Sequence, residues 1–265
     1  MGSAAPAAGS LRARYLVYFQ YRGTDFNGVV AVRGAQRAVG AVGVQNFLEE
    51  AAERLNPVVP IKFTISSRTD AGVHALSNAA HMDVQRRADQ LPLSPEVMTK
   101  ALNTHLKHPA IRVLQTFRVP GDFHARHAAT SRTYLYRLAT GCPTYNQLSV
   151  FERDRCWALR AERLRFWNME FESQSFLYRQ VRRMTAVLVA VGLGALTPAQ
   201  VKAILESRDP MGWSQTCMAP AQGLFLKSVL YGSLAEWNPA STQEENQGFQ
   251  GQGSHRSNQR LEARA

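Results

Sequence analysis

The residues with the clearest capacity for chemistry lie at 66–75, in the sequence Ser-Ser-Arg-Thr-Asp-Ala-Gly-Val-His-Ala. Asp70 is a single carboxylate that follows Arg68 by two residues and precedes the small-residue turn Ala71-Gly72. A carboxylate on such a turn can project into a cleft, where a guanidinium keeps it ionised and able to act as a nucleophile. Aspartate before glycine is also common in ordinary turns, so these local features alone favour a structural role.

A second stretch, residues 122–137, interleaves Arg126, Arg132 and Arg137 with aromatic residues that include Tyr134. Arginines can contact phosphates while a tyrosine ring stacks on a base. An amphipathic strand with a solvated arginine face explains the pattern equally well, so both interpretations stay open.

A third basic stretch falls on a helix expected at about 177–191. Arg182 borders its apolar stripe, so we expect this side chain to be partly buried and to need a carboxylate. Arg179 and Arg183 are expected on the solvated face. Histidine pairs three residues apart, at 105/108 and 124/127, offer too few ligands for a metal site. The sequence shows no phosphate-binding glycine loop of the Walker type and no dinucleotide loop.

The composition indicates a polyanionic partner, although a basic surface that only confers solubility explains the charge equally well. The chain of 265 residues carries a formal net charge of +11, with 26 arginines against 5 lysines, which favours phosphate and therefore nucleic acid. No apolar run is long enough for a membrane span. The odd number of cysteines predicts free thiols in a reducing, intracellular compartment. The first 24 residues contain three arginines and no acid, which leaves a mitochondrial address open beside cytoplasm or nucleus.

Hydrophobic periodicity predicts an α/β fold of the α+β type, with helices on a mixed, mostly antiparallel sheet. We expect helices at 44–55, 94–106, 177–191 and from 197, with strands at 14–21, 58–66, 78–84, 111–119, 131–140, 165–172 and 224–231. Similar series of elements before and after about residue 125 suggest two lobes around a central cleft. The expected parts are a flexible N-terminus (1–13), an N-terminal lobe (14–120), a C-terminal lobe (121–231) and a disordered tail (232–265).

Five stretches together resemble the TruA-type tRNA pseudouridine synthases. Ser67-Arg-Thr-Asp-Ala-Gly-Val-His74 is similar to the signature loop of that family. Four further stretches follow in the same order as the family's other motifs: Tyr21-Arg-Gly-Thr-Asp-Phe-Asn-Gly28, Asp122-Phe-His-Ala-Arg126 through Tyr134-Leu-Tyr136, Phe176-Leu-Tyr-Arg-Gln-Val-Arg182 and Gly223-Leu-Phe-Leu226. The resemblance covers residues 14–231 and implies the pseudouridine synthase fold.

The resemblance also implies roles and a reaction. Asp70 matches the nucleophile, and Arg182 matches the basic group that pairs with it. Tyr134 matches the residue that stacks on the target base, and Arg68 matches one that helps to flip the uridine out. Arg126 and Leu224 lie in matching motifs and are expected to bind substrate. The implied reaction breaks the N1–C1′ bond of a uridine in tRNA, turns the base and rejoins it through C5. Attack on C1′ and attack on C6 are both compatible with it. The resemblance implies no cofactor and no metal, and it leaves a homodimer open.

The sequence departs from the family pattern in three places. Arg22 stands where an acid is usual, and Val29 stands where tryptophan is usual. Between Trp157 and Arg165 only a few residues join motifs that the family separates by a helix and a strand. We therefore expect a shortened form with a truncated second lobe, an exposed apolar surface and an unpaired strand edge.

Three alternatives to an active tRNA pseudouridine synthase follow. The first is a catalytically impaired RNA-binding isoform of the same fold, and the second is a chain that does not fold. A phosphohydrolase that uses Asp70 ranks last, because it needs a metal cluster that the sequence does not offer.

Overall fold

The computed structural model describes residues 10–87, 89–142, 144–208 and 218–232, which belong to one compact unit. The predicted tail, apart from Gly232, and residues 1–9 of the predicted flexible N-terminus lie outside the described residues. The strands are β1 (Ser10–Tyr21), β2 (Phe63–Ile65), β3 (His74–Arg87), β4 (Ile111–Val119), β5 (Ala129–Thr140), β6 (Trp157–Leu159), β7 (Arg165–Ser173) and β8 (Leu224–Tyr231). The α-helices are α1 (Ala35–Ala38), α2 (Val44–Glu53), α3 (Pro95–His105), α4 (Gln180–Gly192) and α5 (Pro198–Ser207), with short 3-10 helices at Gly23–Asp25, Tyr145–Gln147 and Ala221–Gly223.

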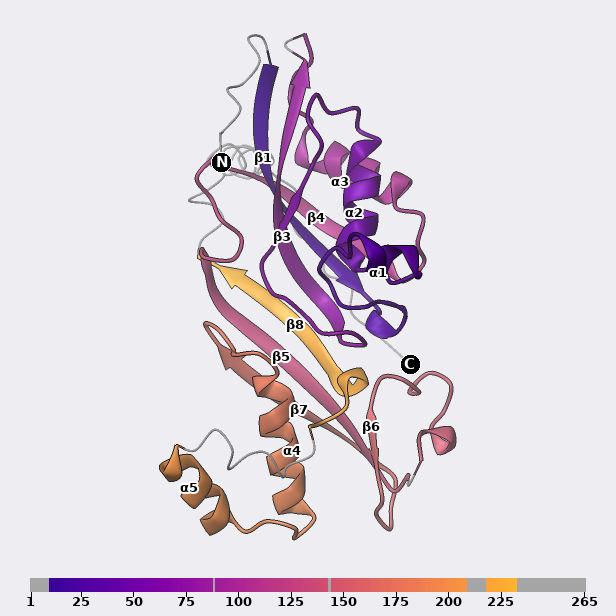
Figure 1. Ribbon diagram of the computed structural model, residues 1–265, viewed down its shortest axis with the longest axis vertical. Helices are drawn as coiled ribbons and strands as arrows, with labels where there is room; N and C mark the ends of the chain where they lie inside the picture. The colour runs from indigo at the N-terminus through magenta and orange to yellow at the C-terminus, as the bar shows by residue number, and fades with distance from the viewer. Residues whose placement is uncertain (1–9, 88, 143, 209–217, 233–265) are drawn as a thin grey trace, which may run out of the picture. The chain divides into compact units, whose positions relative to one another are not determined.

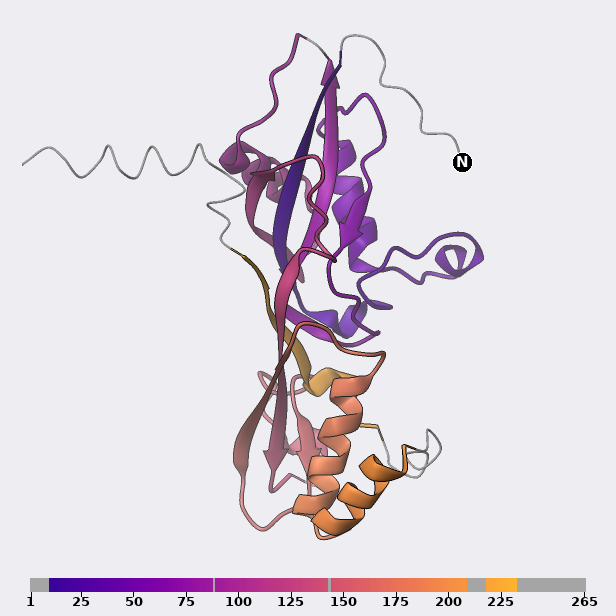
Figure 2. The ribbon, with the colours of Figure 1, turned by 90° about the vertical axis from the view of Figure 1, so that its left-hand side faces the viewer.

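All eight strands form one sheet in the order β4-β1-β3-β8-β5-β6, with β2 also paired to β3 and β7 also paired to β5. The pairings are antiparallel except for β3 with β8 and β5 with β6. Figure 1 shows α2 and α3 beside β1, β3 and β4 at one end of the sheet, and α4 beside β7 at the other end, with α5 next to α4. The turned view in Figure 2 shows β8 crossing the middle of the molecule between these two groups. The predicted mixed, mostly antiparallel sheet with helices is confirmed, whereas the division into two lobes stays a prediction.

The parallel contact between β3 and β8 joins residues far apart in sequence. His74 pairs with Phe225, and Ala75 pairs with Leu226. On its other edge β8 pairs with β5 along Ala129–Tyr136. Strand β8 therefore connects the Asp70 segment, just before β3, to the strand that carries Tyr134.

Helices α2 and α3 begin where the sequence pattern predicts them. In α3 the Ser94 side chain accepts a hydrogen bond from the backbone N–H of Val97, and Pro95 occupies the first helical position. In α2 the apolar residues Val44, Leu48, Ala51 and Ala52 are buried, while Phe47 is partly buried. These local rules suffice for both helices because their apolar faces meet one continuous core.

The strands differ most from the sequence expectation at β1, β2 and β3, and the short strand β6 was not predicted. Strand β1 begins at Ser10, because residues 10–13 pair with the far end of β3. Strand β3 runs over His74–Arg87, longer than the predicted 78–84. Strand β2 is restricted to Phe63–Ile65, and Val58 and Val59 are half exposed outside it. A β-branched run is therefore not enough for a continuous strand, although the N–H of Val58 still donates to the carbonyl of Gln85 on β3 at 2.8 Å.

Candidate active site

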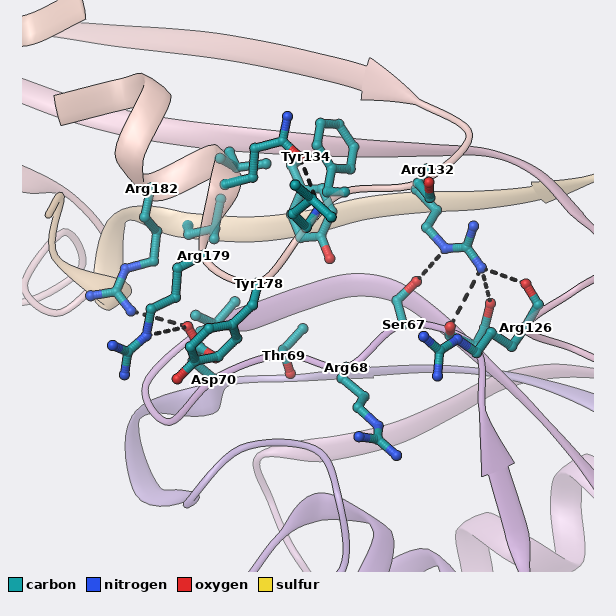
Figure 3. Close-up of a pocket in the computed structure, with 18 of the residues that line it drawn as sticks. Ser67, Arg68, Thr69, Asp70, Arg126, Arg132, Tyr134, Tyr178, Arg179 and Arg182 are labelled. Atoms are coloured by element: carbon teal, nitrogen blue, oxygen red, sulfur yellow. Dashed lines mark hydrogen bonds and ion pairs between the residues drawn. The ribbon is translucent and has the colours of Figure 1, made fainter. Parts of the chain in front are cut away.

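A cavity of about 940 Å³ lies between the Asp70 loop (residues 66–73) and segments from the second half of the chain. Its walls come from the segment after β1 (Asn27 and Val30), the Asp70 loop, β5, the residues just before α4 and the start of β8. Every site residue proposed from the sequence lines it: Arg68, Asp70, Arg126, Tyr134, Arg182 and Leu224. Figure 3 shows the Asp70 loop facing Tyr134 and Arg182 across this cavity.

Two glycines shape the backbone around Asp70. Gly72 has a positive φ of 79°, and the N–H of Val73 bonds the carbonyl of Asp70 at 3.2 Å, which closes a tight turn. Gly28 has a φ of 99°, and a Cβ added there would lie 2.7 Å from the carbonyl oxygen of Thr69. The segment Tyr21–Gly28 therefore needs glycine at position 28, because only a residue without a Cβ lets its backbone pack directly against the backbone of the Asp70 loop.

Buried hydrogen bonds fix the Asp70 loop from below. The hydroxyls of Tyr21 and Thr69 lie 2.7 Å apart, and the Nδ2 of Asn78 donates to the carbonyl of Ser67 at 3.0 Å. The hydroxyl of Ser66 donates to the carbonyl of Ala125 at 2.8 Å. The loop is therefore held by β1, by β3 and by the segment that leads into β5, rather than being a free surface turn.

Arg132 is a buried arginine that connects three segments of the site. Its Nε donates to the Oγ of Ser67 at 2.9 Å, and its Nη2 donates to the carbonyl of Arg126 at 2.8 Å. Its Nη1 donates to the carbonyl of Gln174. Burial lowers the pKa of Arg132, and neutral oxygens satisfy its donors. The sequence singled out Arg132 only as one of three interleaved arginines, and it gave no signal of this bridging role.

The Asp70 carboxylate forms an ion pair with Arg182. The Nη1 of Arg182 lies 3.1 Å from the Oδ2 of Asp70, and the two side chains are 10% and 25% exposed. The Nε of Arg182 donates to the carbonyl of Ala219 at 2.7 Å, and the N–H of Ala219 bonds back to the carbonyl of Arg182 at 3.3 Å. Arg182 is therefore held in place by the backbone just before β8 while it points at Asp70.

A second cation, Arg179, reaches the same carboxylate. Its Nε lies 3.8 Å from the Oδ2 of Asp70, and Figure 3 shows it beside Arg182. The sequence predicted Arg179 on the solvated face of a helix from 177; its side chain is indeed 39% exposed, but the residue lies outside the helix. Helix α4 begins only at Gln180, and Arg179 precedes it in the left-handed conformation with a φ of 59°. That backbone turn directs the side chain to the cavity, and no sequence pattern signals it for an arginine.

Tyr134 forms the aromatic wall of the cavity. The pairing of β5 with β8 shifts register between Thr133 and Tyr134, and such irregularities re-aim side chains next to functional sites. The Tyr134 ring packs edge-on against Phe176, with 5.3 Å between ring centroids. The residue is 8% exposed, and burial raises the pKa of its hydroxyl to about 12. Tyr134 is therefore a neutral phenol with one ring surface available to the cavity.

Three further predicted residues lie on the cavity wall in different ways. Leu224 is buried at the start of β8 and adds apolar surface. Arg126 and Arg68 are exposed. The sequence offered Arg68 as one cation that could hold Asp70 ionised, but no ion pair joins them within the described residues, and Figure 3 shows Arg68 turned away from Asp70. Arg182 and Arg179 take that position instead.

The charges of the cavity define its chemistry. One carboxylate, Asp70, lies among five arginines of the described lining: Arg68, Arg126, Arg132, Arg179 and Arg182. Such a site attracts a polyanion and presents it with one carboxylate and an aromatic surface. Among the described residues, no group of three or more histidine, cysteine, aspartate or glutamate side chains could hold a metal ion. In the same part of the chain, no helix combines the length and apolarity needed to cross a membrane.

Comparison with known proteins adds an independent result. Residues 139–232 match the family model described as tRNA pseudouridine synthase. The chain is 63% identical to human tRNA pseudouridine synthase-like 1, over 88% of this chain and 94% of the relative. It is 61% identical to the mouse protein of the same name, over 88% of this chain and 99% of the relative. It is 32% identical to tRNA pseudouridine synthase A of Maricaulis maris, over 82% of this chain and 98% of the relative. The chain therefore belongs to the tRNA pseudouridine synthase family.

Proposed function

We propose that this protein isomerises uridines in tRNA to pseudouridine, with Asp70 as the nucleophile. The observation that carries the proposal is the Asp70 carboxylate, 3.1 Å from the Nη1 of Arg182, inside a cavity that also contains the buried ring of Tyr134. The two side chains of the ion pair lie 112 residues apart in the sequence. A pairing of this kind, at a turn that points into a cavity, is typical of a functional carboxylate.

The cavity suits a nucleotide that has left its base stack. Its volume of about 940 Å³ falls in the range of small-molecule sites. An enzyme that cuts a glycosidic bond must first extrude the base, which costs a few kcal/mol of stacking. Contacts of the base with Tyr134 and of the phosphates with Arg68 and Arg126 offset that cost. Leu224 lies on the same wall and limits access of water to the base.

The reaction then uses one carboxylate and no external redox partner. The ionised Asp70 attacks the nucleoside, at C1′ or at C6, while Arg182 and Arg179 hold its charge and its orientation. The N1–C1′ bond breaks, the base turns, and C5 forms the new bond to C1′. The hydrogen on C5 leaves as a proton, N1 of the turned base takes up a proton, and expulsion of the carboxylate regenerates the enzyme.

Loss of the C5 hydrogen gives a direct test. tRNA that carries tritium at C5 of uridine should release tritium to water with the wild-type chain and not with Asp70→Ala. Asp25→Ala is the matched control, because Asp25 is half exposed and does not line the cavity. Equal release by wild type and Asp70→Ala would refute the assignment of the nucleophile. Binding of tRNA without release by wild type would instead identify an RNA-binding isoform without catalysis.

We also propose that the second lobe is a shortened form. The alignment with the human relative runs over 289 positions, more than this whole chain, although it takes in only 88% of the chain. Part of the relative therefore has no counterpart here. The short connection from β6 to β7 supports a gap at that point, as do the half-exposed side chains of Phe166 and Trp167 on β7 and of Leu188 on α4.

A further inference from the structure

A second cavity, of about 610 Å³, lies on the opposite face of the same sheet. Tyr134 and Leu224 line the Asp70 cavity, whereas their chain neighbours Leu135 and Phe225 line the second one. Successive side chains of a strand point to opposite faces, so the two cavities share the strands β5 and β8 but not their surfaces. The proposed reaction uses no residue of this second cavity.

The second cavity is strongly basic. Four arginines line it, namely Arg22, Arg112, Arg137 and Arg155, and none of its described lining residues is an aspartate or a glutamate. Positive charges that line a cleft with apolar walls attract anions more strongly than the same charges on an open surface.

Two of these arginines have carboxylate partners outside the cavity, and two do not. Arg137 lies 2.9 Å from Glu152, and Arg22 lies 3.4 Å from Asp25 on the exposed surface. Among the described residues, no ion pair involves Arg112 or Arg155. Two guanidinium groups are therefore available to a ligand that supplies negative charge.

The floor of the cavity is apolar and aromatic. His74 is 2% exposed, and its ring stacks on Phe225 with 4.5 Å between centroids. The N–H of Gly23 donates to the Nδ1 of His74 at 3.0 Å, so its Nε2 carries the proton and donates to the carbonyl of Asp154 at 2.8 Å. The ring is neutral and both its nitrogens are occupied. The four arginines therefore supply the positive charge of this site.

We infer that this second cavity binds the phosphate of a nucleotide. Arginine presents paired donors that match phosphate oxygens, and the volume accommodates a nucleotide whose base lies against the apolar floor. The phosphate comes either from a free nucleotide or from an RNA strand that contacts this face while another part of the RNA occupies the Asp70 cavity.

A pair of charge-matched double variants tests the inference. Arg112→Gln/Arg155→Gln removes the two unpartnered cations. Arg118→Gln/Arg160→Gln removes two exposed cations that do not line the cavity, and Arg118 lies on the same strand as Arg112. Binding of inorganic phosphate, of uridine monophosphate and of a fluorescent oligouridylate is measured over a range of salt concentrations. The first variant should bind about tenfold or more weakly than the control, with a salt slope for RNA lower by about 2.

The probes distinguish the two sources of phosphate. If Arg112→Gln/Arg155→Gln weakens the binding of inorganic phosphate and of the mononucleotide as well as of the RNA, the cavity is assigned to a free nucleotide. Selective loss for the oligouridylate alone assigns it to an RNA strand. Equal affinities of the two double variants for every probe overturn the inference.

Chemical labelling of the wild-type chain gives a readout that does not depend on how the variants fold. Phenylglyoxal modifies accessible arginines, and mass spectrometry locates each adduct. Nucleotide or RNA should slow the modification of Arg112 and Arg155 and leave that of Arg118 and Arg160 unchanged. Unchanged modification of Arg112 and Arg155 at saturating ligand also overturns the inference.

Discussion

The ion pair between Asp70 and Arg182 should give a large coupling energy in a double-mutant cycle. The cycle compares the free energy of unfolding of wild type, Asp70→Asn, Arg182→Gln and the double variant. Substitution of Arg182 also removes the donor to the carbonyl of Ala219. This loss occurs in the single and the double variant alike, so it cancels in the coupling term.

The magnitude follows from the geometry. At 3.1 Å between Nη1 and Oδ2 the Coulomb energy of the pair is about 5 kcal/mol at an effective dielectric constant of about 20. Desolvation of both groups opposes this attraction. Arg179, at 3.8 Å, stays beside the carboxylate when Arg182 is replaced and also reduces the measured difference. We therefore expect a coupling of about 2 kcal/mol.

Urea unfolding followed by circular dichroism measures the four free energies. The exposed pair Lys202–Glu206 on α5, at 3.7 Å, is the matched control, because solvent screening should leave its coupling below about 0.5 kcal/mol. A coupling for Asp70 and Arg182 no larger than that of the control would refute the argument that the cavity strengthens this pair.

Three further predictions follow from the structure. Gly28→Ala should lower the free energy of unfolding by more than about 2 kcal/mol, because the new Cβ would meet a carbonyl oxygen of the Asp70 loop. Gly34 also has a positive φ but has open space around it, so Gly34→Ala should lower the free energy of unfolding by only about 1 kcal/mol. Urea unfolding of both variants measures the difference. Arg132→Lys should cost about 2–3 kcal/mol by the same assay, because an ammonium group cannot reach the three segments that the guanidinium connects; a cost under 0.5 kcal/mol would contradict this bridging role. Burial lowers the pKa of His81 to about 4, below the value near 6.5 expected in the unfolded chain. Between these pH values the unfolded state binds more protons, so the free energy of unfolding should fall by up to about 3 kcal/mol as the pH drops from 6.5 to 4. Urea unfolding at several pH values tests this, and His81→Gln should remove this part of the pH dependence.

The sequence predicted an element correctly where a local signal, such as a helix cap or an apolar stripe, belongs to a segment whose apolar side chains are buried in the core. The apolar stripe of α2 and the cap of α3 lie where the pattern placed them. The expectation was wrong where tertiary contacts decide, as at the early start of β1, which depends on pairing with distant residues of β3. The parallel contact between β3 and β8 has no local signal, because only two residue pairs form it.

For the site, the sequence identified the residue types but not all their partners. The buried position of Arg182 was predicted from the apolar stripe that it borders. The carboxylate that it was expected to need is that of Asp70, whose Oδ2 lies 3.1 Å from the Nη1 of Arg182. The position of Arg179 could not be predicted, because a left-handed residue before the helix turns it toward Asp70. The role of Arg132 depends on carbonyl groups in other segments, and no pattern of side chains reveals backbone acceptors.

The position of β8 at the end of the described residues has a consequence for how the protein is made. The Asp70 loop leaves the ribosome first, and Arg182 follows 112 residues later, which takes roughly 6 to 20 seconds at ordinary rates of translation. Strand β8 comes later still, although it covers the edge of β3 and pairs with β5. Asp70 therefore lacks its counter-charge until Arg182 emerges, and β3 keeps an open edge at His74 and Ala75 until β8 emerges. A ribosome that stops before residue 231 therefore produces a chain that contains the signature loop but cannot assemble the site.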